Sequence, residues 1–116
     1  MGKNIVPESE PVSDSGSDPQ AIIELKGRVA DLDVKRLQTK LEQLYKKRFQ
    51  QIVVDVSQTD FLDSHGLGTI VYYHTLLQKE NRTLLVLNAN PDTSTYINKL
   101  FELTNLDKVL HLVRSL

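Results

Sequence analysis

The sequence predicts a single small α/β domain: a mixed, mostly parallel sheet of four to five strands with three to four helices packed against it. The chain has 116 residues, which is the usual size of one domain. Short apolar runs alternate along it with longer amphipathic segments. Strands that alternate with helices favour parallel pairing through right-handed crossovers.

The expected elements follow one another from residue 21 onward. Strands are predicted at 21–27, 52–56, 83–88 and 109–113, where aliphatic and β-branched residues cluster between polar or glycine boundaries. Helices are predicted at about 32–48 and 66–80, where apolar residues recur every three or four positions. A third helix is expected after Pro91, capped by Asp92 or Thr93 and ending near Leu103.

The first twenty residues differ from the rest in composition. Residues 1–20 hold one lysine and four acidic residues, and between Pro7 and Pro19 only Val12 is a large apolar residue. Such a segment has little to bury against a core. We therefore expect residues 1–20 to form a flexible acidic arm, with an edge strand at 3–6 as an alternative for its start, and residues 21–116 to form the domain.

Composition excludes several classes of function. Fourteen basic and fifteen acidic residues give a net charge of −1, which disfavours direct binding of nucleic acid. The absence of cysteine excludes disulfides, thiol catalysis and thiolate metal sites. No apolar run approaches the length of a membrane span, and the first residues do not resemble a signal peptide. The sequence thus favours a cytoplasmic protein, and it leaves the oligomeric state open.

The most unusual loop of the sequence is the segment 57–68. It follows the strand expected to be most buried and opens the second helix, at the sheet edge where α/β proteins usually carry their sites. Ser64 stands where an N-cap is expected, with its hydroxyl accepting a hydrogen bond from the backbone near Gly66 or Leu67. Gly66 and Gly68 lack Cβ atoms, so another backbone can approach the start of this helix closely.

Hydrolytic catalysis is not expected at this loop. Asp63, Ser64 and His65 are the residue types of a hydrolytic triad, but adjacent residues in a turn point in different directions. Ser64 does not stand in a nucleophile elbow either. Gly66-Leu67-Gly68 is too short for a phosphate-binding fingerprint.

Cofactor and metal sites are not expected either. Asp55, Asp60 and Asp63 are interpreted as solvated or turn-capping carboxylates. His74 and His111 lie in apolar stripes and are interpreted as half-buried packing residues. His65 has no partner at a metal-ligand spacing.

Ser64 itself leaves two interpretations open. It is either a simple helix cap or a phosphate acceptor. A phosphate at a helix N-terminus is stabilised by free N–H groups and by the helix dipole. It would add about −1.5 to −2 charges beside Asp60 and Asp63, so that a docked partner would be repelled while the fold survives.

The central motif resembles the signature of STAS domains, in particular those of the anti-sigma factor antagonists. It runs Asp55-Val56-Ser57 and then, after three polar residues, Phe61-Leu62-Asp63-Ser64-His65-Gly66-Leu67-Gly68. The order of the expected elements from 21 to 116 is similar to that of the family. The segment 100–109 is also similar to the one that joins the family's late helix to its last strand.

This resemblance implies a binding protein and not an enzyme. Members of the antagonist type bind, when unphosphorylated, an anti-sigma factor that is also a GHKL-type serine kinase, and so free a sigma factor. The kinase modifies the serine after the aspartate, which matches Ser64, and a PPM-type serine phosphatase reverses the modification. The family's docking surface maps onto the residues Asp63, Ser64, His65, Gly66 and Leu67, with a contribution from Asp31 or Asp33.

Two departures from the family pattern bear on partner choice. Arg28 stands in Gly27-Arg28-Val29-Ala30, where relatives usually have an acidic residue, and His65 stands where many have a second serine. Ser64 is thus the only hydroxyl acceptor in the part of the motif that runs from Phe61 to Gly68. The same fold also suits a STAS scaffold without phosphorylation, such as an accessory subunit of a signalling complex or of a lipid or anion transporter. A nucleotide-binding role for the loop is a third, less favoured, interpretation.

Overall fold

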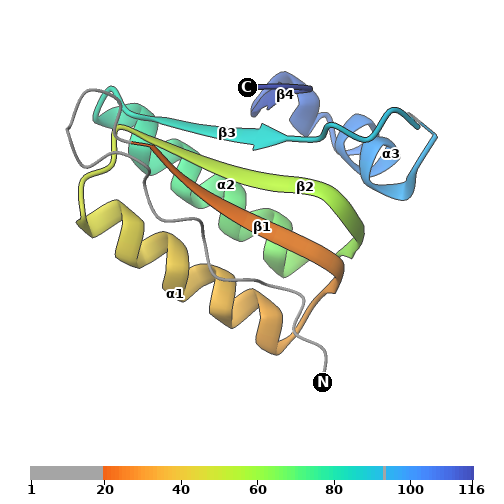
Figure 1. Cartoon of the computed structure of the whole chain (residues 1–116), viewed down its shortest axis with the longest axis horizontal. Coiled ribbons are helices and arrows are strands. Elements are labelled where there is room, and N and C mark those ends of the chain that lie inside the picture. Colours follow the sequence, from red (N-terminus) through yellow and green to blue (C-terminus); the bar gives the residue numbers. More distant parts are fainter. Residues whose placement is uncertain (1–19, 93) are drawn as a thin grey trace.

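A four-stranded sheet sets the layout of the molecule (Figure 1). The computed structural model describes residues 20–92 and 94–116. The strands there stand in the order β1 (Gln20–Val29), β2 (Gln51–Leu62), β3 (Thr83–Leu87) and β4 (His111–Val113). Each neighbouring pair is parallel, so the α/β class is confirmed and the described sheet is wholly parallel, not mixed. The strand expected at 3–6 and the arm up to residue 19 lie outside the described residues.

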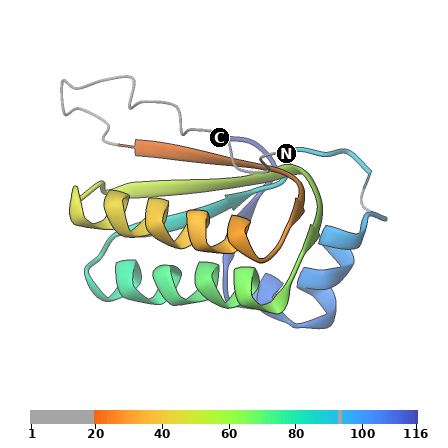
Figure 2. The same cartoon turned by 90° about the horizontal axis from the view of Figure 1, so that it is seen from below.

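Helices connect each strand to the next. They are α1 (Leu32–Lys46), α2 (Ser64–Lys79) and α3 (Tyr96–Leu103), with a short 3₁₀ helix, η1 (Leu106–Lys108), before β4. Crossovers that always step to the next strand in one direction place successive helices on the same face of the sheet. Figure 2 shows α1 and α2 side by side on one face, and Figure 1 shows α3 near β4.

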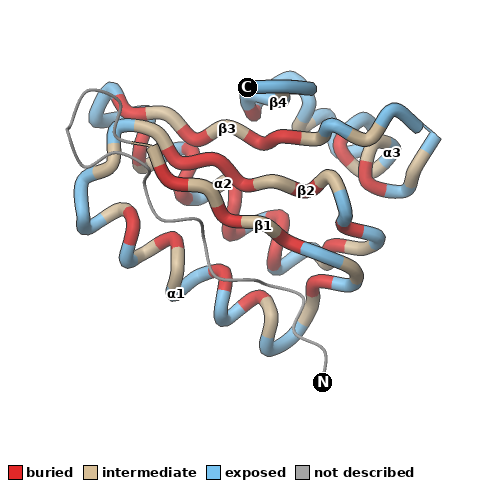
Figure 3. The backbone as a smooth tube through the Cα atoms, in the orientation of Figure 1, coloured by how far each residue is buried: buried red, intermediate tan, exposed pale blue. Residues whose placement is uncertain are grey.

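The hydrophobic core fills the space between the sheet and the helices. Alternate residues of β1 and β3 are buried there, and the apolar stripes of α1 and α2 face them (Figure 3). Fully buried members include Ile23, Leu25, Leu37, Leu41, Leu44, Ile52, Val54, Ile70, Leu77, Leu84 and Val86. Burying each such side chain contributes about 1.5–3 kcal/mol, which makes this layer the main source of stability.

The second strand is longer than the sequence predicts. Residues 57–62, expected to begin a loop, continue β2 up to Leu62 because β1 also runs on and keeps pairing with it, past two register shifts. The Thr59 hydroxyl is buried and donates to the carbonyl of Leu25 at 3.1 Å. The polar residues of this stretch therefore belong to a bulged pair of strands, although their composition alone did not predict a strand.

The C-terminal elements are shorter than predicted. The helix after Pro91 begins at Tyr96 and is capped by Thr95, whose side chain accepts from the N–H of Asn98. Asp92 instead accepts from the N–H and hydroxyl of Ser94 in a local turn. The other expected cap, Thr93, lies outside the described residues. Residues 106–108 form η1, so β4 starts at 111 and not at 109.

Polar contacts fix α1 against α2. The Tyr73 hydroxyl donates to Glu42 and the Tyr45 hydroxyl to Glu80, each at 2.5 Å. These bonds lower the pKa of both carboxyl groups, while burial raises the pKa of Tyr73.

Arg82 is buried and donates to the carbonyls of Phe49 and Tyr45 at 2.9 Å and to Glu80 at 2.8 Å. The orientation of α2, and hence of Ser64, is set by this network.

Candidate functional site

The candidate site lies where β1 and β2 end together. Val29 and Leu62 are register partners, and the N–H of Asp63 donates to the carbonyl of Val29 at 3.3 Å. This bond brings the β1–α1 connection and the start of α2 to the same edge of the sheet. Sequence reasoning placed its candidate residues in these two segments, and the structure brings the segments together.

Asp63, and not Ser64, is the N-cap of α2. The Asp63 backbone is extended, with φ −79° and ψ 173°, and its Oδ1 accepts from the N–H of Gly66 at 2.8 Å. The prediction that the Ser64 hydroxyl caps the helix is therefore wrong. Aspartate and serine cap helices about equally well, so the pattern of residues alone did not separate them.

Ser64 is the first residue of α2 and is exposed. Within residues 20–92 and 94–116, its hydroxyl makes no hydrogen bond to another residue. His65 is also exposed, and in that part of the chain it bonds to neither Asp63 nor Ser64. The Asp63 carboxylate is engaged with the helix backbone, so these three side chains do not form a proton-relay arrangement. They leave Ser64 as an accessible hydroxyl at a helix start.

The next two residues shape the site from below. A Cβ at Gly66 would lie 2.7 Å from Cδ1 of Leu62, so any larger residue there would force the Leu62 side chain to shift. Leu67 is 7% exposed and belongs to the hydrophobic core. Both residues were candidates for partner binding, and the structure places them beneath the surface that Ser64 and His65 present.

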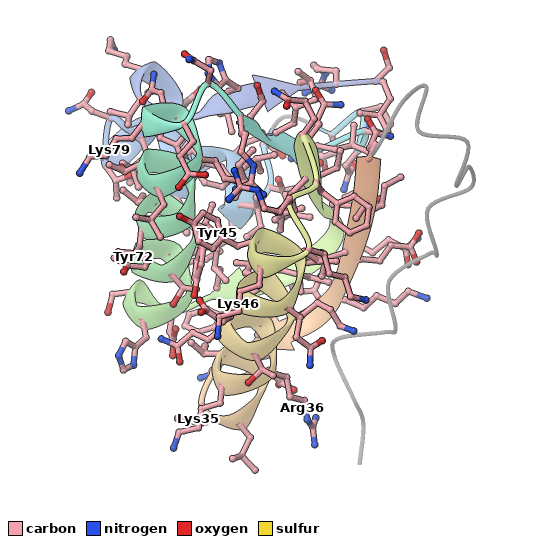
Figure 4. All side chains as sticks on the ribbon, turned by 90° about the vertical axis from the view of Figure 1, so that its left-hand side faces the viewer. Lys35, Arg36, Tyr45, Lys46, Tyr72 and Lys79 are labelled. Carbon is pink, nitrogen blue, oxygen red and sulfur yellow. The ribbon has the colours of Figure 1, made fainter. Side chains whose placement is uncertain are left out.

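A groove runs from Ser64 along the junction of α1 and α2. Its first part encloses about 240 Å³ and is lined by Gln38, Ser64, His65, Gly68, Thr69, Tyr72 and Tyr73. A second part of about 410 Å³ shares Gln38 and Tyr73 and continues along α1 towards Lys46. Figure 4 faces this side, with Tyr72 on α2 and Lys35, Arg36 and Lys46 on α1.

Sequence reasoning missed this groove and its lining. The spacing of Ser64, Gly68 and Tyr72, four residues apart each time, could have placed all three on one side of the second helix. Gln38 had no comparable signal, because its position across from Ser64 depends on how the two helices pack.

The two acidic candidates of the β1–α1 connection differ in their surroundings. Asp31 is exposed, has a positive φ of 54° and makes no capping hydrogen bond. Asp33 stands in the first turn of α1 and forms an ion pair with Arg36 at 3.4 Å. Asp31 therefore offers the more accessible carboxylate near this edge of the sheet.

Arg28 takes part in a stack beside the site. Its guanidinium lies 4.1 Å from the centre of the Phe61 ring, and Phe61 stacks on Tyr96 at 5.4 Å between ring centres. The stack joins the ends of β1 and β2 to the start of α3. It puts a positive charge where the family resemblance leads one to expect a negative one.

The two remaining histidines lie elsewhere. His74 on α2 is 3% exposed, so it is more deeply buried than predicted, whereas His111 on β4 is exposed. Their rings meet edge to face at 5.4 Å. Burial lowers the pKa of His74, and His111 lowers it further. In the described ranges, no group of three metal-ligating side chains is assembled, and no helix is long and apolar enough to cross a membrane.

Comparison with known proteins gives a family match and several structural neighbours. The STAS domain family matches residues 12–116. An anti-sigma factor antagonist from Mycobacterium paratuberculosis is similar in structure, with a TM-score of 0.71 at 23% identity over 95% of this chain and 88% of that one. The unphosphorylated form of the anti-sigma factor antagonist SpoIIAA has a TM-score of 0.64 at 17% identity, over 86% and 84% of the two chains.

The phosphorylated form of the Bacillus cell fate determinant SpoIIAA is similar as well. Its TM-score is 0.63 at 18% identity, with 84% of this chain and 86% of that one covered. Identities this low show a shared fold and nothing more specific. The family match, in contrast, spans most of the sequence and includes every described strand and helix. This protein is therefore a member of the STAS domain family.

Proposed function

We propose that this protein is an anti-sigma factor antagonist that is switched by phosphorylation of Ser64. In its unmodified form it binds an anti-sigma factor of the GHKL kinase type in the cytoplasm, and it thereby releases a sigma factor. The kinase transfers the γ-phosphoryl group of ATP to the Ser64 hydroxyl oxygen, which loses its proton as ADP departs. A PPM-type phosphatase hydrolyses the phosphoserine and returns serine and inorganic phosphate.

The observation that carries this proposal is the state of the Ser64 hydroxyl. It is exposed at the start of α2, and Asp63 has taken the capping role that serine could have filled. Because the described fold uses no hydrogen bond from this hydroxyl, modification removes no structural contact. The N-terminal end of α2 also favours an added negative charge.

The change in binding has an electrostatic cause. The exposed Asp31 and Asp60 and the partly buried Asp63 lie in the segments around Ser64. A phosphate adds about −1.5 to −2 charges to this acidic edge, so a partner that accommodates the neutral serine would face repulsion and a desolvation cost. The proposed docking surface comprises Asp31, Asp33, Asp63, Ser64, His65, Gly66 and Leu67, with Gly66 and Leu67 acting through the shape they impose.

The test incubates the protein and ATP with purified anti-sigma factor kinases from the organism that encodes it. We expect wild-type protein to gain one phosphate by intact mass, Ser64→Ala to gain none, and Ser94→Ala, which alters another exposed serine, to behave as wild type. Binding of the kinase should weaken at least tenfold after modification. A phosphate mapped to another residue, or tight kinase binding without transfer, would refute the switch and favour an unphosphorylated scaffold.

A further inference from the structure

Gly68 is a glycine that the fold itself does not need. Apart from its chain neighbours and the nearby backbone of its own helix, a Cβ built at this position meets no atom within 4 Å, in contrast to Gly66, where it would meet Leu62 at 2.7 Å. Gly68 lies in the second turn of α2 and is not among the residues with positive φ. In an exposed helix interior, glycine in place of alanine lowers the folding equilibrium constant by roughly two- to fivefold. The isolated protein therefore gains nothing from this residue.

The position of Gly68 suggests what its missing side chain serves. Ser64, Gly68 and Tyr72 follow one another at four-residue steps, and all three are exposed and line the same groove. Gly68 thus leaves a bare strip of helix backbone between the proposed phosphate acceptor and a tyrosine ring. Tyr72 is 58% exposed and its ring packs edge to face on buried Tyr73, with 5.1 Å between ring centres.

The charges of the two helices that form the groove indicate the chemistry of its occupant. Residues of α1 and α2 include five lysines or arginines, at 35, 36, 40, 46 and 79, but only two carboxylates, at 33 and 42. Lys35 lies one turn before the groove residue Gln38, on the same side of α1, and is exposed. It forms no ion pair within the described ranges. The helix layer is therefore positive in a chain whose net charge is −1.

We propose that the main chain of the partner kinase packs directly on α2 at Gly68, with an acidic side chain of the kinase opposite Lys35. This contact rests on the proposed function and deepens it, because close approach at Gly68 holds the kinase one helical turn from the Ser64 hydroxyl. A side chain at position 68 would separate the two backbones. Tyr72 borders the contact on its far side and supplies a rigid aromatic surface.

The first experiment separates stability from docking. Gly68→Ala and Gly68→Leu should both resist urea better than wild type, by a factor of roughly two to five in the folding equilibrium constant for alanine. Kinase affinity should nevertheless fall with side-chain size, by roughly tenfold or more for leucine, as expected for overpacking. Gln78→Leu places the same leucine side chain at an exposed position of α2 outside the groove lining and should bind as wild type.

The second experiment tests the charge. Lys35→Glu should weaken kinase binding and reduce its dependence on salt, whereas Lys79→Glu, at the other end of α2, should do neither. Unchanged affinity and unchanged transfer to Ser64 in Gly68→Leu would overturn this contact while leaving the proposed function intact. Loss of stability in Gly68→Ala would also overturn it, since the fold would then require the glycine. Failure of wild type to bind or accept phosphate would overturn both proposals.

Discussion

The two ends of α2 differ in how fully their polar groups are engaged. At the C-terminal end, buried Arg82 donates to two carbonyls and to Glu80, and Glu80 also accepts from Tyr45. At the N-terminal end, the Ser64 hydroxyl makes no hydrogen bond within the described residues, and Gly68 faces open space. One helix thus has an end tied into the fold and an end that presents unengaged groups at the surface.

This difference separates stability from recognition within one helix. Polar groups that are buried and paired are costly to disturb, because each broken bond leaves a partner unsatisfied. Groups at the surface without partners can be modified at little cost to the fold. A charge added at Ser64 can therefore act on binding alone, while the C-terminal network keeps α2 in place.

The largest effect on stability is expected at the C-terminal end of α2, where Arg82 is buried and hydrogen-bonded. Arg82→Met removes three side-chain hydrogen bonds and leaves the carbonyls of Phe49 and Tyr45 without this donor. We expect a loss of about 3 kcal/mol in the free energy of unfolding, measured by urea denaturation. Arg48→Met is the matched control, since Arg48 is 72% exposed at 3.9 Å from the same glutamate. Its effect should stay within about 0.5 kcal/mol, and equal losses in both variants would contradict the comparison.

A smaller loss of stability is expected at the N-terminal end of α2, where Gly66 meets the core. Gly66→Ala forces a Cβ against the buried Leu62 side chain, which must shift within a packed interior. We expect a destabilisation of about 1–2 kcal/mol by urea denaturation. Gly68→Ala, two residues later, should instead stabilise by about 0.5–1 kcal/mol. If both substitutions changed the free energy of unfolding in the same direction, the difference in packing between the two glycines would not affect stability.

The tyrosines between α1 and α2 should make stability sensitive to alkaline pH. Burial, followed by the bond to Glu42, raises the pKa of Tyr73, and the bond to Glu80 raises that of Tyr45. Their stabilisation is fully present below the unfolded tyrosine pKa of about 10, and it is lost as pH rises through the higher folded values. The urea midpoint should therefore fall above pH 10. Tyr73→Phe should reduce the slope of that fall, and an unchanged slope would show that Tyr73 does not titrate with unfolding.

Most of the fold was predictable because its signals are local. The three- and four-residue spacing of Leu37, Leu41 and Leu44 indicates the buried side of α1, and the run 52–56 indicates a buried strand. The extent of β2 was not predictable, since residues 57–62 stay in the sheet only through pairing with the bulged end of β1. The late start of α3 has a local cause instead, because Asp92 closes a turn with Ser94 and Thr95 then caps the helix.

The candidate site was predictable in sequence but not in geometry. The motif around Ser64 marks the right segment, yet the choice of Asp63 as cap depends on one hydrogen bond to Gly66. The groove depends on how α1 packs beside α2, so no sequence pattern predicted that Gln38 and Tyr73 would line it. Contacts between segments distant in sequence are what local patterns do not encode.

The smallest effect on stability is expected at Ser64 itself. Ser64→Glu places a negative charge in the first turn of α2, where the helix dipole favours it and the neighbouring Asp63 opposes it. We expect the free energy of unfolding to stay within about 0.5 kcal/mol of wild type in urea. Asp63→Ala, one residue away, should lose about 1 kcal/mol because it removes the cap on Gly66. A loss at Ser64 as large as that at Asp63 would mean that the hydroxyl supports the fold, and a phosphate there would then act by unfolding the helix start instead of by repelling a partner.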